Sequence, residues 1–419
     1  MEESGVTSRG SAPPATFPAN DMKQKEIAFL NDILPSQNGG TGIVFIALSQ
    51  FGLAFCFNVV MSFMPFYIIK ISPYSASETM IWIGMIMGLN SFISATTAPF
   101  WGSLTSKFRP KVLFQGAFLF NGIILLLMGF ANSLPVLLVL RLIQGGFGGA
   151  STIGFFMVSQ LSPKDVLTRN LSLYQNSMTA GQLLGPPVGA YLAANLGYRS
   201  PFFFSVSLIF VSLVLCQIYV AEIQKKEADR DRTIRFNRGV LWGWALSFIA
   251  TIHLTFLPSI LPHILKGFGL VVEDALKSAG LIMMGYTASA IVGSYVISRL
   301  APREKLPGVI AAVCLAAAFF QTLLYVSQGV ISFTAIRMLQ SGVIAAVLPL
   351  VMATFVSGLG GAGIGFLNSA RFAGNGVGPL MATFVLAGSN LLTLYLLISA
   401  LTVGVVLAFW MTDEKKKAT

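Results

Sequence analysis

The stretch AGQLLGPPVGA, residues 180–190, places two adjacent prolines and three glycines inside a long apolar run. Proline lacks the backbone donor and clashes with the preceding turn, which costs a helix in water about 3 kcal/mol. A second stretch, AGNGVGPLMA at 373–382, repeats the A-G-x-x-x-G-P pattern. Inside a membrane protein such a helix is tolerated when neighbouring helices or side chains satisfy the freed backbone groups. Both stretches therefore predict bent, tightly packed membrane helices.

The composition agrees with a membrane location. Of the 419 residues, 55% are hydrophobic and only 10% are charged, and the mean hydropathy is +0.76. Soluble domains are about 25% charged. The apolar residues form blocks of about 20 to 28, long enough for a helix to cross roughly 30 Å of hydrocarbon. The twelve expected spans are 42–69, 79–104, 111–131, 134–160, 168–195, 199–221, 240–265, 276–299, 307–328, 330–356, 361–387 and 389–411.

The positive charge is distributed unevenly between the two sides of these spans. The formal net charge is +11. When the connecting segments are assigned to alternate sides, twenty lysines and arginines fall on the side of both termini and four on the other. The positive-inside rule then predicts that both termini are cytoplasmic. The basic character thus reports membrane topology and gives no reason to expect a nucleic-acid partner.

Three sequence matches indicate an internal repeat. SKFRPK (106–111) recurs as SRLAPR (298–303), and RLIQGG (141–146) recurs as RMLQSG (337–342). The offsets of 192 and 196 residues bracket the 193 of the proline stretches. Ordered matches at nearly one offset predict two structural repeats.

The repeat sets the expected domain organisation. We predict two six-helix halves, 42–221 and 240–411, joined by a cytoplasmic linker at 222–239. Cytoplasmic tails cover 1–41 and 412–419. The expected fold class is an all-α polytopic membrane protein with twelve transmembrane helices in two pseudo-symmetric halves.

In this order and on these spans, the motifs resemble those of the major facilitator superfamily, in particular its twelve-span drug/proton antiporter branch of bacterial multidrug efflux proteins. The matching positions are Gly102, Lys107, Arg109 and Lys111 for motif A, Arg141 and Gln144 for motif B, and Gly181, Gly185 and Pro186 for the antiporter motif C. The resemblance implies a gating or structural role for them and for their second-half counterparts Arg337, Gly374, Gly378 and Pro379. Generic close packing without a gating role is the alternative for the glycine and proline stretches.

Motif A departs from the family pattern at one chemically important position. The family aspartate is Ser106 here, and Ser298 stands at the corresponding place in the second half. In the family this aspartate helps to lock one conformation by pairing across the two halves. A serine cannot hold an arginine by charge, so we expect this lock to be weaker or replaced.

The acidic residues restrict how transport can be driven. All sixteen lie in tails, loops or span edges. Proton-driven transporters commonly carry protons on an intramembrane carboxylate, and no such group is expected here. The membrane interior instead holds Arg141, Arg337, Arg371 and His253.

Two interpretations apply to each of these interior groups. Arg371, near the midplane, either attracts anionic groups of a substrate or bonds helix carbonyls. Arg141 and Arg337 either act in function or, as their repetition suggests, hold spans four and ten in place. His253 either carries a coupling proton or is a neutral, packed histidine. We also expect Asn58, His253, Gln340 and Asn375 to contact substrate, the first three because the resemblance places their spans around a central cavity.

Two functions follow as hypotheses. The first is proton-coupled multidrug efflux of small amphipathic, including anionic, compounds across a bacterial inner membrane by alternating access. The alternative is a dedicated transporter of an organic anion or metabolite, chelated metal included, working by exchange or facilitated diffusion. The sequence carries no enzyme motif, and its three cysteines lack metal-site spacing. We therefore expect no enzyme activity and no cofactor, and a monomer whose partners are the lipid bilayer and a small-molecule substrate.

Overall fold

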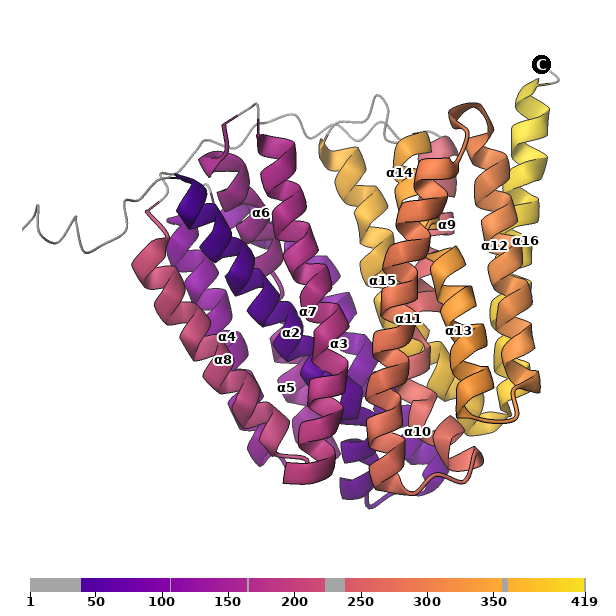
Figure 1. Ribbon diagram of the computed structural model, residues 1–419, viewed down its shortest axis with the longest axis horizontal. Coiled ribbons are helices and arrows are strands. Elements are labelled where there is room, and N and C mark those ends of the chain that lie inside the picture. The colour runs from indigo at the N-terminus through magenta and orange to yellow at the C-terminus, as the bar shows by residue number, and fades with distance from the viewer. Residues whose placement is uncertain (1–38, 106, 164–165, 223–237, 356–360, 418–419) are drawn as a thin grey trace, which may run out of the picture.

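A computed structural model describes residues 39–105, 107–163, 166–222, 238–355 and 361–417. In these residues the chain is helical and contains no strand (Figure 1). The expected N-terminal tail, most of the linker and Ser106 lie outside the described residues. The predicted all-α fold is confirmed.

The first half contains seven helices. They are α2 (Gly39–Ile71), α3 (Ala76–Leu104), α4 (Pro110–Phe130), α5 (Leu134–Gly146), α6 (Ala150–Leu161), α7 (Leu167–Leu196) and α8 (Ser200–Tyr219). The pair α5 and α6 together forms the fourth span.

In its described residues the second half contains eight α-helices, because its first span is divided into two. Its α-helices are α9 (Arg238–Thr255), α10 (Leu257–Gly267), α11 (Val272–Leu300), α12 (Leu306–Leu323), α13 (Val330–Ile344), α14 (Val347–Phe355), α15 (Gly361–Gly388) and α16 (Leu391–Lys417). Two short 3₁₀ turns, η1 (Arg303–Lys305) and η2 (Leu324–Val326), flank α12. The last helix continues past residue 411, where the span was expected to end.

Ten of the described helical stretches are long and apolar enough to cross a membrane. The remaining two spans are α7 and α15, the helices that carry the repeated glycine and proline pattern. Their lower hydropathy has a visible cause, because α7 includes asparagine, glutamine, serine and threonine side chains. The two helices are nevertheless integral to the bundle, since α7 packs along α2 and α15 packs along α9 and α3.

The seventh span is broken where the sequence block appears continuous. Helix α9 ends at Thr255 and α10 begins at Leu257. Pro258 explains the break, because proline cannot donate to the carbonyl four residues before it, which belongs to Leu254.

The two halves lie side by side, and two helix pairs form most of the contact between them. Helix α3 packs against α15, and α7 packs against α11. In Figure 1 the first half runs from indigo through magenta to rose, and the second from salmon through orange to yellow. Helix α2 begins and α16 ends at the upper end in this view, which we call the terminal end; the opposite end is the far end.

Close contacts between the halves lie towards the far end. Ser77, at the start of α3, donates a 2.5 Å hydrogen bond to the carbonyl of Ala387. About two turns further, Gly84 packs against Thr383 of α15. The halves therefore meet closely at the end of the bundle away from the two chain ends.

Candidate functional site

The glycines of the quoted stretch pack α7 onto α2. A methyl group added at Gly181 would lie 2.6 Å from the carbonyl oxygen of Phe51. At Gly185 it would lie 2.7 Å from the carbonyl oxygen of Phe55. Side chains do not fit at such distances, so these glycines allow the two helix backbones to approach within one half.

The second-half glycines make the equivalent contact with α9. A methyl group at Gly374 would lie 2.6 Å from Cβ of Thr251, and one at Gly378 would lie 2.5 Å from Oγ1 of Thr255. In both halves, the fifth span, α7 or α15, is thus fitted against the first span by glycines four residues apart.

The prolines of α7 face the other half of the protein. A methyl group at Gly280 of α11 would lie 2.9 Å from the carbonyl oxygen of Pro186 and 3.0 Å from Cα of Pro187. Helix α7 therefore uses its glycines to pack within its half and its prolines to pack across the halves. In the second half, Pro379 is buried, and its carbonyl accepts a 2.9 Å hydrogen bond from Thr383.

Arg371 and Asn375 lie one turn apart on one face of α15. Phe384 is exposed and follows Asn375 by nine residues, about two and a half turns, so it marks the opposite, outward face. The Arg371 and Asn375 side chains therefore point to the interior of the bundle. Both are only partly buried, and among the described residues neither side chain has a hydrogen-bond partner.

The first half presents a matching amide. Gln182 of α7 precedes Asn375 by the repeat offset of 193 residues, and the exposed Tyr191 follows it by nine, as Phe384 follows Asn375. Within the described part of the chain, the partly buried Gln182 side chain also makes no hydrogen bond. The two proline-containing helices thus contribute one cation and two amides to interior-facing positions.

Arg141 and Arg337 are fully buried and use the repeated R-x-x-Q pattern in the same way. Arg141 donates to Oε1 of Gln144 over 2.9 Å. Arg337 donates to the side-chain oxygen of Gln340 and stacks over the rings of Phe256 and Tyr286, at 5.0 and 4.7 Å from the ring centroids. The glutamine three residues later therefore supplies an acceptor for each arginine.

Arg337 also caps the broken seventh span. Its guanidinium donates to the carbonyls of His253, at 2.8 Å, and of Leu254, at 3.3 Å. The Leu254 carbonyl is the one that Pro258 deprives of its helical donor. Our sequence analysis missed this contact, although FNVVMSFMP (57–65) and ATIHLTFLP (250–258) share a proline at the repeat offset.

His253 belongs to a buried hydrogen-bond network in the second half. Its Nδ1 lies 2.7 Å from Nε2 of Gln340, and its Nε2 lies 2.8 Å from Oγ1 of Thr402. Gln340 must present its amide group to His253, because its oxygen already accepts from Arg337. Thr402 donates to the carbonyl of Ile398. His253 therefore accepts at Nδ1 and donates at Nε2, which is the pattern of a neutral imidazole.

Two other expected substrate contacts are engaged within the helices. Asn58 donates to the carbonyl of Ala54 in its own helix over 2.8 Å, and its Cβ faces Gly185. Gln340 is fully buried and also donates to Gln321 over 2.7 Å. The structure thus brings His253 and Gln340 together, and leaves Arg371 and Asn375 apart from them on the other side of α9.

The motif A positions lie at the terminal end. Gly102 is in the last turn of α3, and Lys107 is exposed in the loop that follows. Arg109 precedes α4 and lies 4.0 Å from the carboxylate of Glu222. Lys111 is buried, and its Nζ donates to the carbonyl of Gln217 over 3.1 Å. These contacts join α4 to the end of α8 within the first half.

The described residues contain no group of three His, Cys, Asp or Glu side chains that could hold a metal ion. Cys56, Cys216 and Cys314 are buried free thiols.

Comparison with known proteins identifies the family to which this helical architecture belongs. The family model described as Major Facilitator Superfamily matches residues 46–379, and the chain belongs to this superfamily, whose members are transporters and not enzymes. It is 24% identical over 380 residues to the multidrug resistance protein MdtG of Escherichia fergusonii, covering 86% of this chain and 91% of the relative. It is 25% identical over 370 residues to MdtG of Salmonella paratyphi A, covering 84% and 89%.

Solved structures with the same fold are more distant in sequence. A bacterial homologue of the human lysosomal transporter Spinster, in an inward-facing and occupied conformation, superposes with a TM-score of 0.69 at 14% identity, covering 89% of this chain and 96% of that one. The human organic anion transporter MFSD10 superposes with a TM-score of 0.65 at 16% identity, covering 90% and 100%. These likenesses support the transporter fold.

Proposed function

We propose that this protein exports small amphipathic compounds across a bacterial inner membrane and prefers anionic ones, with Arg371 as the substrate-binding cation. The observation that carries the proposal is the interior-facing guanidinium of Arg371, about 15 Å into α15, which has no hydrogen-bond partner in the described part of the chain. An arginine at that depth is costly unless it faces water or a partner. A carboxylate or phosphate group of a substrate accepts two parallel hydrogen bonds from the planar guanidinium of Arg371.

The two amides fit the same role. Asn375 lies one turn from Arg371 on α15, and Gln182 occupies the related position on α7. Helices α7 and α15 also form contacts between the halves, so a ligand bound at these side chains would influence how the two halves meet. Alternating access would proceed by rocking of the halves around this position.

Export of an anion needs no titratable side chain, since a negative-inside membrane potential expels it with about 2.3 kcal/mol per charge per 100 mV. This supports potential-driven export and fits a membrane interior in which the described residues include no carboxylate. Proton antiport through His253 is the second candidate. It would require the Gln340 and Thr402 contacts to open, because a second ring proton would meet the amide donors of Gln340.

The localisation proposal rests on charge. With both termini cytoplasmic, Lys107, Arg109, Lys111 and Arg299 lie on the inner side, as the positive-inside rule favours. We propose a monomer, because the two halves already provide the complete pair of repeats. The relatives named MdtG support multidrug efflux over the narrower alternative of a dedicated metabolite carrier.

Growth of a pump-deficient bacterium tests the proposal. Wild type, Arg371→Ala and Arg371→Lys would be expressed at matched membrane abundance and challenged with cationic and anionic toxic compounds. We expect protection against anions that is lost in Arg371→Ala and partly kept in Arg371→Lys. Protection against cations alone, unchanged in Arg371→Ala, would contradict the assignment.

A further inference from the structure

A groove of about 430 Å³ opens on the outer surface between α4 and α8, close to the terminal end. It is lined by Val112, Gln115, Gly116, Leu119, Leu213, Val214 and Gln217. Its walls are largely apolar, and Val112, Leu119 and Val214 are exposed. Gly116 provides depth, because an added methyl group there would meet no atom within 4 Å. The groove runs from the start of α4 about two turns into the hydrocarbon region.

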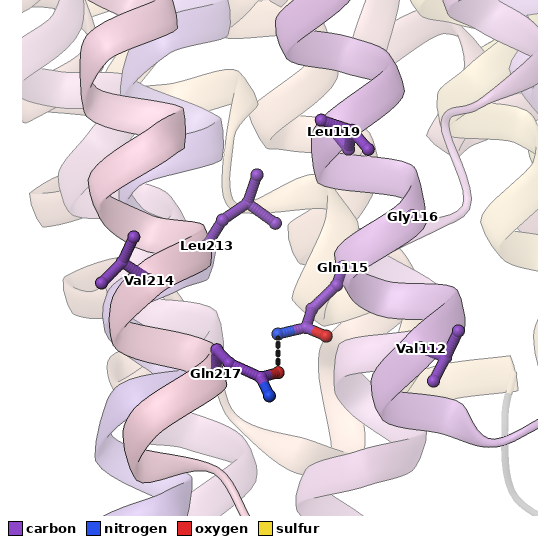
Figure 2. A pocket seen from close by; sticks show the side chains of 7 residues that line it. All are labelled: Val112, Gln115, Gly116, Leu119, Leu213, Val214 and Gln217. Atoms are coloured by element: carbon purple, nitrogen blue, oxygen red, sulfur yellow. Dashed lines mark hydrogen bonds between the residues drawn. The ribbon is translucent and has the colours of Figure 1, made fainter.

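The polar end of this groove is only partly satisfied. Figure 2 shows the Gln115 and Gln217 side chains meeting across the groove. Nε2 of Gln115 donates to Oε1 of Gln217 over 3.0 Å. Among the described residues, Oε1 of Gln115 and Nε2 of Gln217 have no further partner. Amide atoms that face hydrocarbon without partners are unfavourable, so this end of the groove favours an occupant with polar atoms.

The mouth of the groove carries positive charge. Arg109 is the extended residue that precedes α4, three residues before Val112, and it lies 4.0 Å from Glu222, which follows Gln217 by five residues, so it lies at the terminal end of the groove. Lys107 is exposed in the same loop, and buried Lys111 bonds the Gln217 carbonyl. Among the described residues, Glu222 is the acidic group at the mouth, and its side chain and that of Arg109 are both well exposed. Such an exposed pair is weak and leaves Arg109 able to bind a phosphate.

We propose that this groove binds one phospholipid with an anionic headgroup from the leaflet at the terminal end. The phosphate lies at Arg109, the glycerol ester region lies against Gln217 and Gln115, and one acyl chain fills the space over Gly116. The groove presents a cationic mouth, then two amide side chains, then an apolar floor. A phospholipid carries its phosphate, its ester groups and its acyl chains in the same order. Anionic lipids are attracted by basic side chains at this depth.

A second groove provides the control. It is about 400 Å³ in volume and lies between α9 and α16, lined by Trp242, Leu397, Ala400, Leu401, Gly404, Val405 and Ala408. Gly404 there also has open space above it. This groove offers no amide or cationic side chain in its lining, so it should hold acyl chains without headgroup selectivity.

Native mass spectrometry of the full-length protein in an uncharged detergent tests the proposal, with phosphatidylglycerol and phosphatidylcholine of the same acyl chains as probes. We expect wild type to retain one phosphatidylglycerol in preference to phosphatidylcholine. Gly116→Leu should lose that adduct, whereas Gly404→Leu should keep it. Arg109→Gln should weaken it about fivefold, and Glu222→Gln should strengthen it. Melting curves would verify folding, with Val112→Trp as a second way to close the groove.

Three results would overturn the proposal. The first is equal retention of the two lipids by wild type, and the second is retention of phosphatidylglycerol by a folded Gly116→Leu protein. The third is a wild-type dimer that Gly116→Leu converts to a monomer, which would make the groove an interface between two copies of this chain.

Discussion

Arg337 donates to the carbonyl of Leu254 over 3.3 Å, and Pro258 is the residue that leaves this carbonyl without its helical donor. A side chain on α13 thus replaces a backbone donor missing from the seventh span. A buried charge is costly unless it is hydrogen-bonded, and both terminal nitrogens of this guanidinium donate to the broken span, so the span and the buried arginine stabilise each other.

Replacing Arg337 should therefore destabilise the second half. Arg337→Met leaves the carbonyls of His253 and Leu254 without the guanidinium, and we expect a loss of about 2–4 kcal/mol. The measurement is unfolding in detergent followed by helical circular dichroism. Arg337→Lys should fall between wild type and Arg337→Met, because one ammonium group cannot reach all three acceptors as the planar fork does.

Pro258→Ala tests whether the backbone donor missing at Pro258 is the reason that Arg337 stabilises this span. It restores an N–H that can reach Leu254, so the double variant Arg337→Met/Pro258→Ala should recover part of the lost stability. A double-mutant cycle measures this coupling. Equal effects of Pro258→Ala in both backgrounds would show that the proline and the arginine act independently.

The hydrogen-bond pattern of His253 predicts a structural role. His253→Phe removes the bonds to Gln340 and Thr402 and should lower stability by about 1–3 kcal/mol. The folded fraction should still transport, with an unchanged dependence of rate on pH. Stopped-flow transport in proteoliposomes between pH 5.5 and 8 provides the measurement. A folded variant whose rate no longer responds to pH would instead assign the coupling proton to His253.

The glycine contact between α7 and α2 predicts a strong position effect. Gly185→Ala forces the helices apart, because its methyl group would lie 2.7 Å from the Phe55 carbonyl oxygen. We expect a destabilisation of about 1–3 kcal/mol. Gly116→Ala, where open space surrounds the new group, should change stability little. Comparable melting temperatures for the two variants would contradict the packing described here.

The contact between Gly280 and α7 predicts a change in conformational preference. Gly280→Leu cannot fit beside Cβ of Ala190, which lies 2.6 Å from the added Cβ, and it should open the halves at the far end. A disulfide between Ser77→Cys and Ala387→Cys reports whether α3 and α15 meet at the far end, because Ser77 donates directly to the Ala387 carbonyl. Disulfide formation should be fast in the parent and slow with Gly280→Leu. Unchanged crosslinking would mean that the halves close without this contact.

The sequence was sufficient for the features that repeat. Gly181 and Gly185 have the same spacing as Gly374 and Gly378, and this predicted two equivalent helices. Small residues four apart lie on one face of a helix and allow a neighbouring helix to approach it closely. The R-x-x-Q repeat likewise predicted equivalent positions for Arg141 and Arg337. The spacing of repeated residues along the sequence therefore predicted most of the fold.

Contacts between distant helices were beyond the reach of spacing. His253 was considered for proton transfer because its residue type titrates near neutral pH, yet its position depends on Gln340 and Thr402, which lie 87 and 149 residues away. The direction of Arg371 became clear only when the exposed Phe384 fixed the outward face of α15. The break before Pro258 was hidden by the continuous apolar run around it.

The most direct test of the proposed function is export of an anionic fluorescent compound from proteoliposomes under an imposed potential, negative inside, with no pH gradient. We expect wild type to release the anion faster as the potential increases, Arg371→Ala to lose this export, and Arg371→Lys to keep part of it. Export that requires a pH gradient, ignores the potential and persists in Arg371→Ala would contradict an anion site at Arg371.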